Sequence, residues 1–228
     1  MDRNSEAGSG LKKMLAPRRW MFATVILMLV VATGCQAGML FMPWYVWKGN
    51  LTEPEHMNLF KEKKVVVVCR PQGSDLYNYP TVPKNLARVV GKLLRDNGKK
   101  IEVVPYSKVD DWVDNNSWYT DFIEVGEAMK ADYVLGIDLA YFTARECNSQ
   151  TLKQGNARLR FEVIDCKTGD IVFEDTIGQF LYPPNSPRSD SETTESEFVT
   201  EYVELLADRI GRNFYAYDPH TDIAMDHL

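Results

Sequence analysis

Residues 131–180 read ADYVLGIDLAYFTARECNSQTLKQGNARLRFEVIDCKTGDIVFEDTIGQF, and this stretch decides the fold. Residues 133–142 form an almost unbroken apolar and aromatic run, interrupted by Gly136 and Asp138. Such a run is typical of a strand that is buried on both faces, so we expect it to be the central strand of a sheet. Residues 158–165 alternate apolar with charged side chains, which predicts a strand that covers a core on one face only.

A third strand is predicted at residues 170–177, after the segment CKTG at residues 166–169. This spacing indicates a tight hairpin in which Gly169 supplies a positive φ. The segment of residues 143–156, which precedes the alternating strand, is polar, and we expect it to be a loop. Residues 181–192 are rich in Pro and Ser, and we expect a second loop there.

The amino-terminal half adds two strands and two helices by pattern. Residues 64–69 read KVVVVC, a β-branched run that predicts a buried strand, and residues 101–106 predict the next one. Apolar residues recur at helical spacing between Thr81 and Asn97, and again at residues 121–130. Residues 107–116 are expected to form a short acidic turn, and Thr194 with Glu197 predicts a capping box that opens the last helix.

The predicted fold class is therefore α/β, with elements in the order β-α-β-α-β-β-β-α. We expect a single domain at residues 64–217, built on a mixed five-stranded sheet, and a tail at residues 218–228. The first three strands are joined by helical crossovers and should be parallel, whereas the last two are added by hairpins and should be antiparallel.

The charge of the chain is unevenly spread. Residues 1–34 carry five Lys and Arg against two Asp and Glu, a charge of +3. Because the whole chain has a net charge of −6, the rest of the chain carries −9. An acidic body argues against nucleic acid or an anionic lipid surface as the main partner. The four cysteines are too few and too scattered for a disulfide scaffold or a zinc site.

The first 34 residues have the order of an export signal: basic residues, an apolar run at residues 20–31, small residues, and then Cys35. This arrangement resembles a bacterial lipoprotein signal, which implies cleavage before Cys35 and acylation of that cysteine with chains such as palmitate. An alternative is an uncleaved signal anchor, because apolar character resumes through Met42 and residues 20–42 are long enough to span a bilayer. Residues 35–63, after the signal, are expected to be an apolar start followed by a polar tether.

Candidate chemistry is sparse. Asp110, Asp111 and Asp114 lack the alternate spacing and the glycine of a calcium loop, so a solvated turn is favoured over a metal site. The three histidines, His56, His220 and His227, are expected at the surface. None of the motifs GxSxG, GxGxxG, GxxxxGK[ST] or HExxH occurs. We therefore predict no catalytic residue, cofactor, metal or small-molecule substrate, and we leave open whether any of Cys69, Cys147 and Cys166 pair.

Aromatic residues gather on the segments that are predicted to follow the parallel strands, where open α/β sheets place their ligands. Rigid aromatic rings are common anchors of protein interfaces, so this group is the candidate partner-binding site, although some of its members could cover the core instead. The group consists of Tyr77, Tyr79, Trp112, Trp118 and Tyr119.

Several phrases together resemble a known layout: KVVVVC, GEAMKADYVLGIDL, RFEVIDCKTGDIVFED and LADRIGRNFY. They are similar to the periplasmic lipoprotein domains related to the N-terminal domain of TolB, including LpoB-type activators of penicillin-binding proteins and the curli-secretion lipoprotein. The resemblance covers residues 64–217 and implies a noncatalytic, membrane-anchored module of the bacterial cell envelope. It would lie on the periplasmic side and bind an envelope protein. The alternatives are an envelope hydrolase with an unrecognised site and a purely structural lipoprotein.

Overall fold

The computed structural model describes residues 51–116, 118–147, 149 and 151–219. The predicted signal, Cys35 and most of the predicted tail lie outside these residues. The strands are β1 (Lys64–Pro71), β2 (Glu102–Val103), β3 (Tyr133–Arg145), β4 (Leu152–Asp165), β5 (Ile171–Tyr182) and β6 (Arg188–Ser189). The helices are the 3-10 helix η1 (Ser74–Asn78), α2 (Val82–Asn97), α3 (Tyr106–Asn115), α4 (Phe122–Met129) and α5 (Glu195–Gly211).

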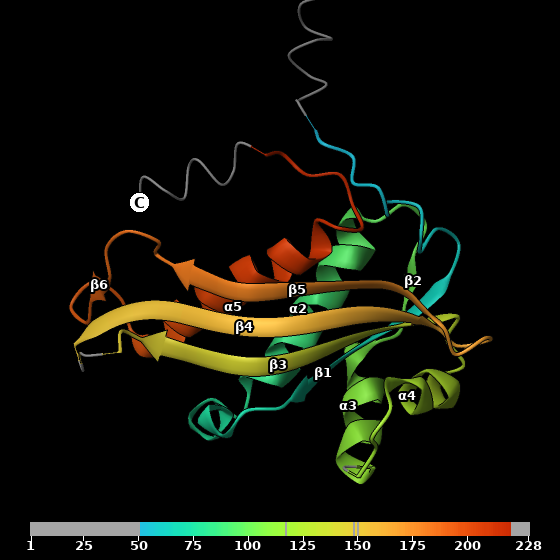
Figure 1. The fold of residues 1–228 in the computed structure, drawn as a ribbon, viewed down its shortest axis with the longest axis horizontal. Helices are drawn as coiled ribbons and strands as arrows, with labels where there is room; N and C mark the ends of the chain where they lie inside the picture. The colour runs from blue at the N-terminus through green and yellow to red at the C-terminus, as the bar shows by residue number, and fades with distance from the viewer. Residues whose placement is uncertain (1–50, 117, 148, 150, 220–228) are drawn as a thin grey trace, which may run out of the picture. The chain divides into compact units, whose positions relative to one another are not determined.

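The strands form one mixed sheet in the order β2-β1-β3-β4-β5, and β6 pairs with the start of β4 (Figure 1). β1 pairs in parallel with β2 and β3, whereas β3, β4 and β5 pair antiparallel, so the predicted strand directions are confirmed. β3 is the middle strand, as its apolar run predicts. Gly169 has a φ of 76° in the hairpin between β4 and β5, and Thr194 and Glu197 form the predicted capping box.

Three predicted boundaries are wrong. The second strand has two residues instead of six, because Pro105 has no N–H to continue the ladder and stands as the N-cap residue of a helix. Residues 107–116, predicted as a turn, belong mostly to that helix, α3. The segment at residues 143–156 is mostly strand, because β3 continues to Arg145 and β4 begins at Leu152. The short β6 also makes the sheet six-stranded where five strands were predicted.

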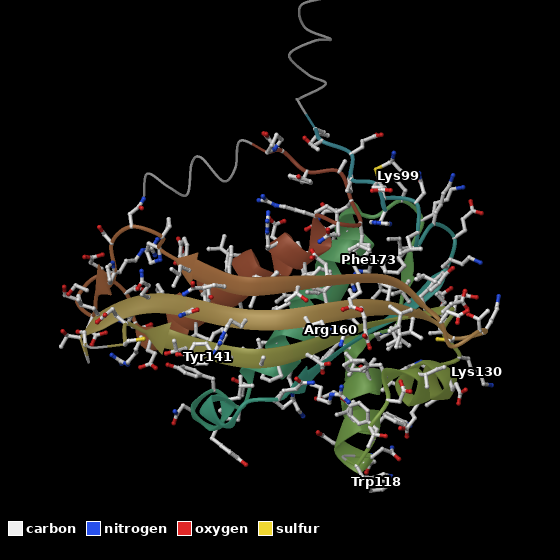
Figure 2. The ribbon with its side chains drawn as sticks, in the orientation of Figure 1. Lys99, Trp118, Lys130, Tyr141, Arg160 and Phe173 are labelled. Carbon is white, nitrogen blue, oxygen red and sulfur yellow. The ribbon has the colours of Figure 1, made fainter. Side chains whose placement is uncertain are left out.

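Helices lie on both faces of the sheet and cover the second face only in part. α2 and α5 lie behind the sheet in Figure 1 and pack on the larger core, around Leu86, Phe142 and Tyr202. α3 and α4 cover the other face near β1, where Val66, Val134 and Phe122 form a second cluster. The part of this face on β4 and β5 carries charged side chains, including Arg160, which contacts Glu162 at 3.0 Å and Glu174 at 2.8 Å. Figure 2 shows Tyr141 and Arg160 on this face.

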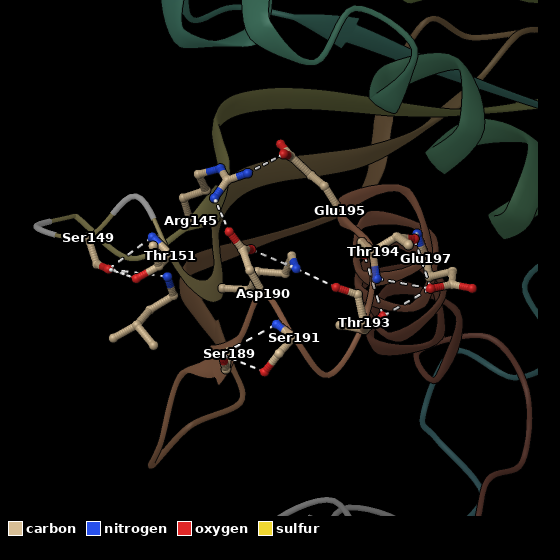
Figure 3. A network of polar contacts seen from close by, with 12 residues as sticks. Arg145, Ser149, Thr151, Ser189, Asp190, Ser191, Thr193, Thr194, Glu195 and Glu197 are labelled. Atoms are coloured by element: carbon tan, nitrogen blue, oxygen red, sulfur yellow. Dashed lines mark hydrogen bonds and ion pairs between the residues drawn. The ribbon is translucent and has the colours of Figure 1, made fainter.

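A polar network fixes the end of the β3–β4 hairpin to the start of α5 (Figure 3). Arg145 contacts Asp190 at 3.4 Å and Glu195 at 2.5 Å. The side chain of Lys153 is only 2% exposed, and its Nζ lies 2.7 Å from Asp190. A buried ammonium needs such a partner, so this network specifies how the hairpin docks.

Residues 51–63, expected to belong to the tether, lie against the folded unit in the structure. Phe60 is 1% exposed, with its ring centroid 4.7 Å from that of Phe214. Thr52 pairs with Tyr217 as an isolated bridge. Phe60, together with the partly buried Leu59, supplies the apolar burial of this segment.

Candidate partner-binding groove

An apolar groove of about 490 Å³ opens where β1 ends and η1 begins. We call it the η1 groove. It brings together the carboxyl end of β1, the turn of η1 and the first turn of α2. Its lining consists of Pro71, Gln72, Gly73, Leu76, Tyr77, Pro80 and Pro83.

The backbone holds the groove in place at its two ends. The Gln72 N–H donates to the carbonyl of Leu139 at 2.9 Å, which fixes the chain as it leaves β1. A Cβ at Gly73 would lie 2.3 Å from the carbonyl oxygen of Ala140, so only glycine allows this approach. Leu76, at 4% exposure, anchors η1 in the core.

The two tyrosines of this segment have different environments. Tyr77 is 87% exposed at the rim of the groove. Tyr79 packs edge-on against Phe142, with ring centroids 5.2 Å apart, and its hydroxyl accepts a hydrogen bond from the Ala144 N–H at 3.3 Å. Tyr79 therefore packs against the larger core, and Tyr77 is the side chain presented to solvent.

The remaining predicted aromatic residues also divide. Trp118 is 73% exposed on the connection between α3 and α4 (Figure 2). Tyr119 is 9% exposed, its ring centroid lies 5.8 Å from that of Trp112, and burial raises its pKa to about 12. Trp112 packs against the second core cluster. The structure thus brings Tyr79, Trp112 and Tyr119 into the core layers and leaves Tyr77 and Trp118 available to a partner.

Arg70 connects the end of β1 to the connection that carries Trp118. Its guanidinium donates to Asp138 at 2.9 Å and to the carbonyl of Thr120 at 2.6 Å. The same group lies 4.5 Å from the centre of the Phe122 ring. These contacts fix the start of α4 and the approach to it from Trp118.

Two acidic residues of α3 form ion pairs with a lysine of α2. Lys84 Nζ lies 2.7 Å from Asp110 and 2.8 Å from Asp114, and these hydrogen bonds raise the pKa of Lys84. The Tyr106 hydroxyl donates to Asp110 at 3.2 Å, and burial together with this carboxylate raises the pKa of Tyr106. Within the described ranges no three His, Cys, Asp or Glu side chains group as metal ligands do. The acidic cluster therefore joins α3 to α2.

Cys69 and Cys166 have the environment of structural cysteines, whereas Cys147 is exposed. Cys69, Cys147 and Cys166 are all free in the structure. Burial raises the pKa of Cys69 well above its usual value and that of Cys166 to about 11. A thiol with such a pKa is protonated at neutral pH and is a poor nucleophile. His56 packs against Phe173, with ring centroids 4.4 Å apart, and His220 and His227 lie outside the described residues.

Sequence reasoning found the aromatic rim of the groove but missed its prolines. Pro71, Pro80 and Pro83 flank Tyr77 within a dozen positions, and this clustering was the available signal. Their role as one lining depends on the fold, because η1 has to turn the chain back before Pro83 can face Pro71.

Comparison with known proteins gives matches only among solved structures: no family model matches the chain, and no curated protein does. Solved structures similar to it include bacterial lipoproteins. The PelC dodecamer from Paraburkholderia phytofirmans is 15% identical, covers 73% of this chain and 96% of its own, and has a TM-score of 0.43. Lipoprotein GNA1162 from Neisseria meningitidis is 12% identical, covers 64% and 96%, and has a TM-score of 0.43. The LpoB C-terminal domain from Salmonella enterica is 16% identical, covers 60% and 90%, and has a TM-score of 0.32.

Among the described residues, none of the helices has the length and apolar character needed to cross a membrane.

Proposed function

We propose that this chain is a membrane-anchored, noncatalytic lipoprotein of the bacterial envelope that binds a protein partner through the η1 groove. The observation that carries the proposal is the pairing of an 87% exposed tyrosine with an apolar groove lined by three prolines. Exposed aromatic side chains beside apolar recesses are the usual anchors of protein interfaces.

Rigidity supports this assignment. Prolines lose little conformational freedom on binding, and the segment that lines the groove is anchored in the core by Leu76 and Tyr79. A preformed recess keeps the entropic cost of association low. Trp118 would supply a second contact from the neighbouring connection.

The anchor belongs to the same proposal. Cys35 would carry the lipid, with the uncleaved signal anchor as the alternative, and either would hold the domain beside a membrane. The partner would be an envelope protein whose assembly or enzymatic activity this domain regulates.

Site-specific photo-crosslinking tests the proposal. A photoreactive phenylalanine replaces Tyr77 in the full chain in cells, and the same residue replaces Lys108 as the control, since both positions are exposed. We expect a discrete crosslinked protein from position 77 that is absent from position 108 and is weakened by Trp118→Ala. Equal crosslinking at both positions, or none at position 77, would contradict a binding role for the groove.

A further inference from the structure

A second groove, of about 200 Å³, lies between α2 and the segment that joins β2 to α3. We call it the α2 groove. Its floor is apolar and consists of Val67, Ala87, Gly91, Val103 and Val104. Three cationic side chains, Arg88, Lys92 and Arg95, line it along α2, and Pro105 and Tyr106 form the opposite wall.

The three cations share one face of the helix. Positions 88, 92 and 95 are spaced by four and three residues, which places their side chains one above the other. This concentration of positive charge stands out in a chain whose net charge is −6. It raises the local concentration of anions at the mouth of the groove.

Carboxylates on neighbouring elements pair only weakly with these three cations, so the cations can contact a ligand. Lys84, one turn before Arg88, takes up both Asp110 and Asp114. Arg95 contacts Asp96 at 3.2 Å, but both side chains are about half exposed, and such pairs are weak. No ion pair of Arg88 or Lys92 is found in the part of the chain that the structure describes.

The sheet leaves room for a ligand at this place. On the side of β1 away from β3, β2 pairs only with Lys64 and Val65. In the described sheet no strand pairs with that edge of β1 at Val67. Gly91 keeps the floor open: a Cβ there would lie 3.5 Å from Val103 and 3.9 Å from Val67. These are ordinary van der Waals distances, so a side chain at position 91 would occupy space above Val103 and Val67.

From this geometry we propose that the α2 groove binds a phosphate group carried by a ligand with a short apolar portion. The guanidinium groups of Arg88 and Arg95 match the paired oxygens of a phosphate, and Lys92 adds a third positive charge. The carbon atoms next to the phosphate would lie on the floor formed by Val67 and Val103. The volume admits a phosphate and a few carbons, given about 30 Å³ for a water molecule, so a longer chain would extend into solvent.

The test uses the full chain in nonionic detergent and follows the shift in Tm with ligand concentration. Its two probes are inorganic phosphate and dihexanoyl phosphatidylglycerol, a soluble phosphate ester with short apolar chains. The variant Arg88→Gln/Lys92→Gln/Arg95→Gln removes the cations. The control Lys61→Gln/Lys167→Gln/Arg209→Gln changes the net charge equally at exposed positions elsewhere.

We expect the wild type and the control to bind the phosphate ester with the same affinity. The groove variant should bind it at least about tenfold more weakly, because the loss of one charge-assisted hydrogen bond lowers affinity by about tenfold. Gly91→Leu should abolish binding of the ester while the three cations remain. If inorganic phosphate binds as tightly as the ester and Gly91→Leu has no effect, the apolar part of the proposal is wrong. If the control loses as much affinity as the groove variant, or neither probe binds, the site itself is refuted.

Discussion

Adding one methyl group at Gly136 should destabilise the domain strongly. In the structure a Cβ at this position would lie 2.3 Å from Phe122 Cδ2 and 2.6 Å from two further carbons of that ring. Carbon atoms in contact normally lie about 3.5 to 4.0 Å apart, so the ring has to move by more than about 1 Å. Phe122 is 2% exposed and belongs to the cluster by which α4 packs on the sheet.

The ring has little room to move. The Arg70 guanidinium lies 4.5 Å from its centre, and α4 is fixed at its start by a capping box between Asp121 and Glu124. Overpacking of this kind costs about 1 to 3 kcal/mol, and we expect Gly136→Ala to reach the upper end of that range. For a folded unit of this size, about 3 kcal/mol corresponds to a decrease in Tm of roughly 6 to 12 °C.

Gly178→Ala is the matched control, because Gly178 also lies in a strand and a Cβ there would have no neighbour within 4 Å. Both variants are melted as full chains in nonionic detergent, followed by near-ultraviolet circular dichroism. The control should stay within about 0.5 kcal/mol of the wild type. A difference of less than about 2 °C in Tm between Gly136→Ala and Gly178→Ala would mean that their free energies of unfolding differ by less than about 1 kcal/mol. In that case α4 does not pack on β3 as described.

Three further predictions concern the groove, a titrating carboxylate and the anchor. Tyr79→Ala should lower the free energy of unfolding by about 2 kcal/mol or more, because it removes the contact with Phe142. Tyr77→Ala should change that free energy by less than about 0.5 kcal/mol, and it should still reduce crosslinking by a photoreactive residue placed at position 118. Thermal melts compare the two variants, and equal destabilisation would contradict the different roles of these tyrosines. Burial raises the pKa of Glu162, so the folded state binds the proton of this carboxyl group more tightly than the unfolded state does. The wild type should therefore lose stability relative to Glu162→Gln as the pH rises above the usual glutamate pKa. Urea titrations at pH 4 and pH 7 check the sign, and a change in the opposite direction would refute it. The intact mass of the membrane-extracted chain should show a start at Cys35 with added acyl mass that Cys35→Ser abolishes, and an unprocessed chain in both samples would favour the signal anchor.

The hairpin region shows how far local patterns extend. The apolar run of β3, the alternation of β4 and Gly169 each depend on residues next to one another in the chain, and the structure confirms all three. The capping box at Thr194 is local in the same sense. The polar ends of β3 and β4 were mistaken for a loop, because their pairing is stabilised by contacts with distant residues, such as that of Lys153 with Asp190.

The candidate site was only partly predictable for the same reason. The sequence identified five aromatic residues but could not separate Tyr77 and Trp118 from the three that pack inward, since a ring becomes part of the core only when a partner such as Phe142 lies against it. The acidic residues of α3 likewise gave no sign of their contact with Lys84, which lies on another helix.

By itself, the sequence determined the α/β class, the directions of the strands and the acidic body, because each of these follows from composition or from residues close together in the chain. Only the tertiary structure decided which aromatic residues face solvent, that three prolines line one groove, and that Arg88, Lys92 and Arg95 border an open edge of the sheet. These properties depend on the packing of α2, η1 and α3 around the end of β1, which joins residues that are far apart in sequence and therefore leaves no local pattern to read.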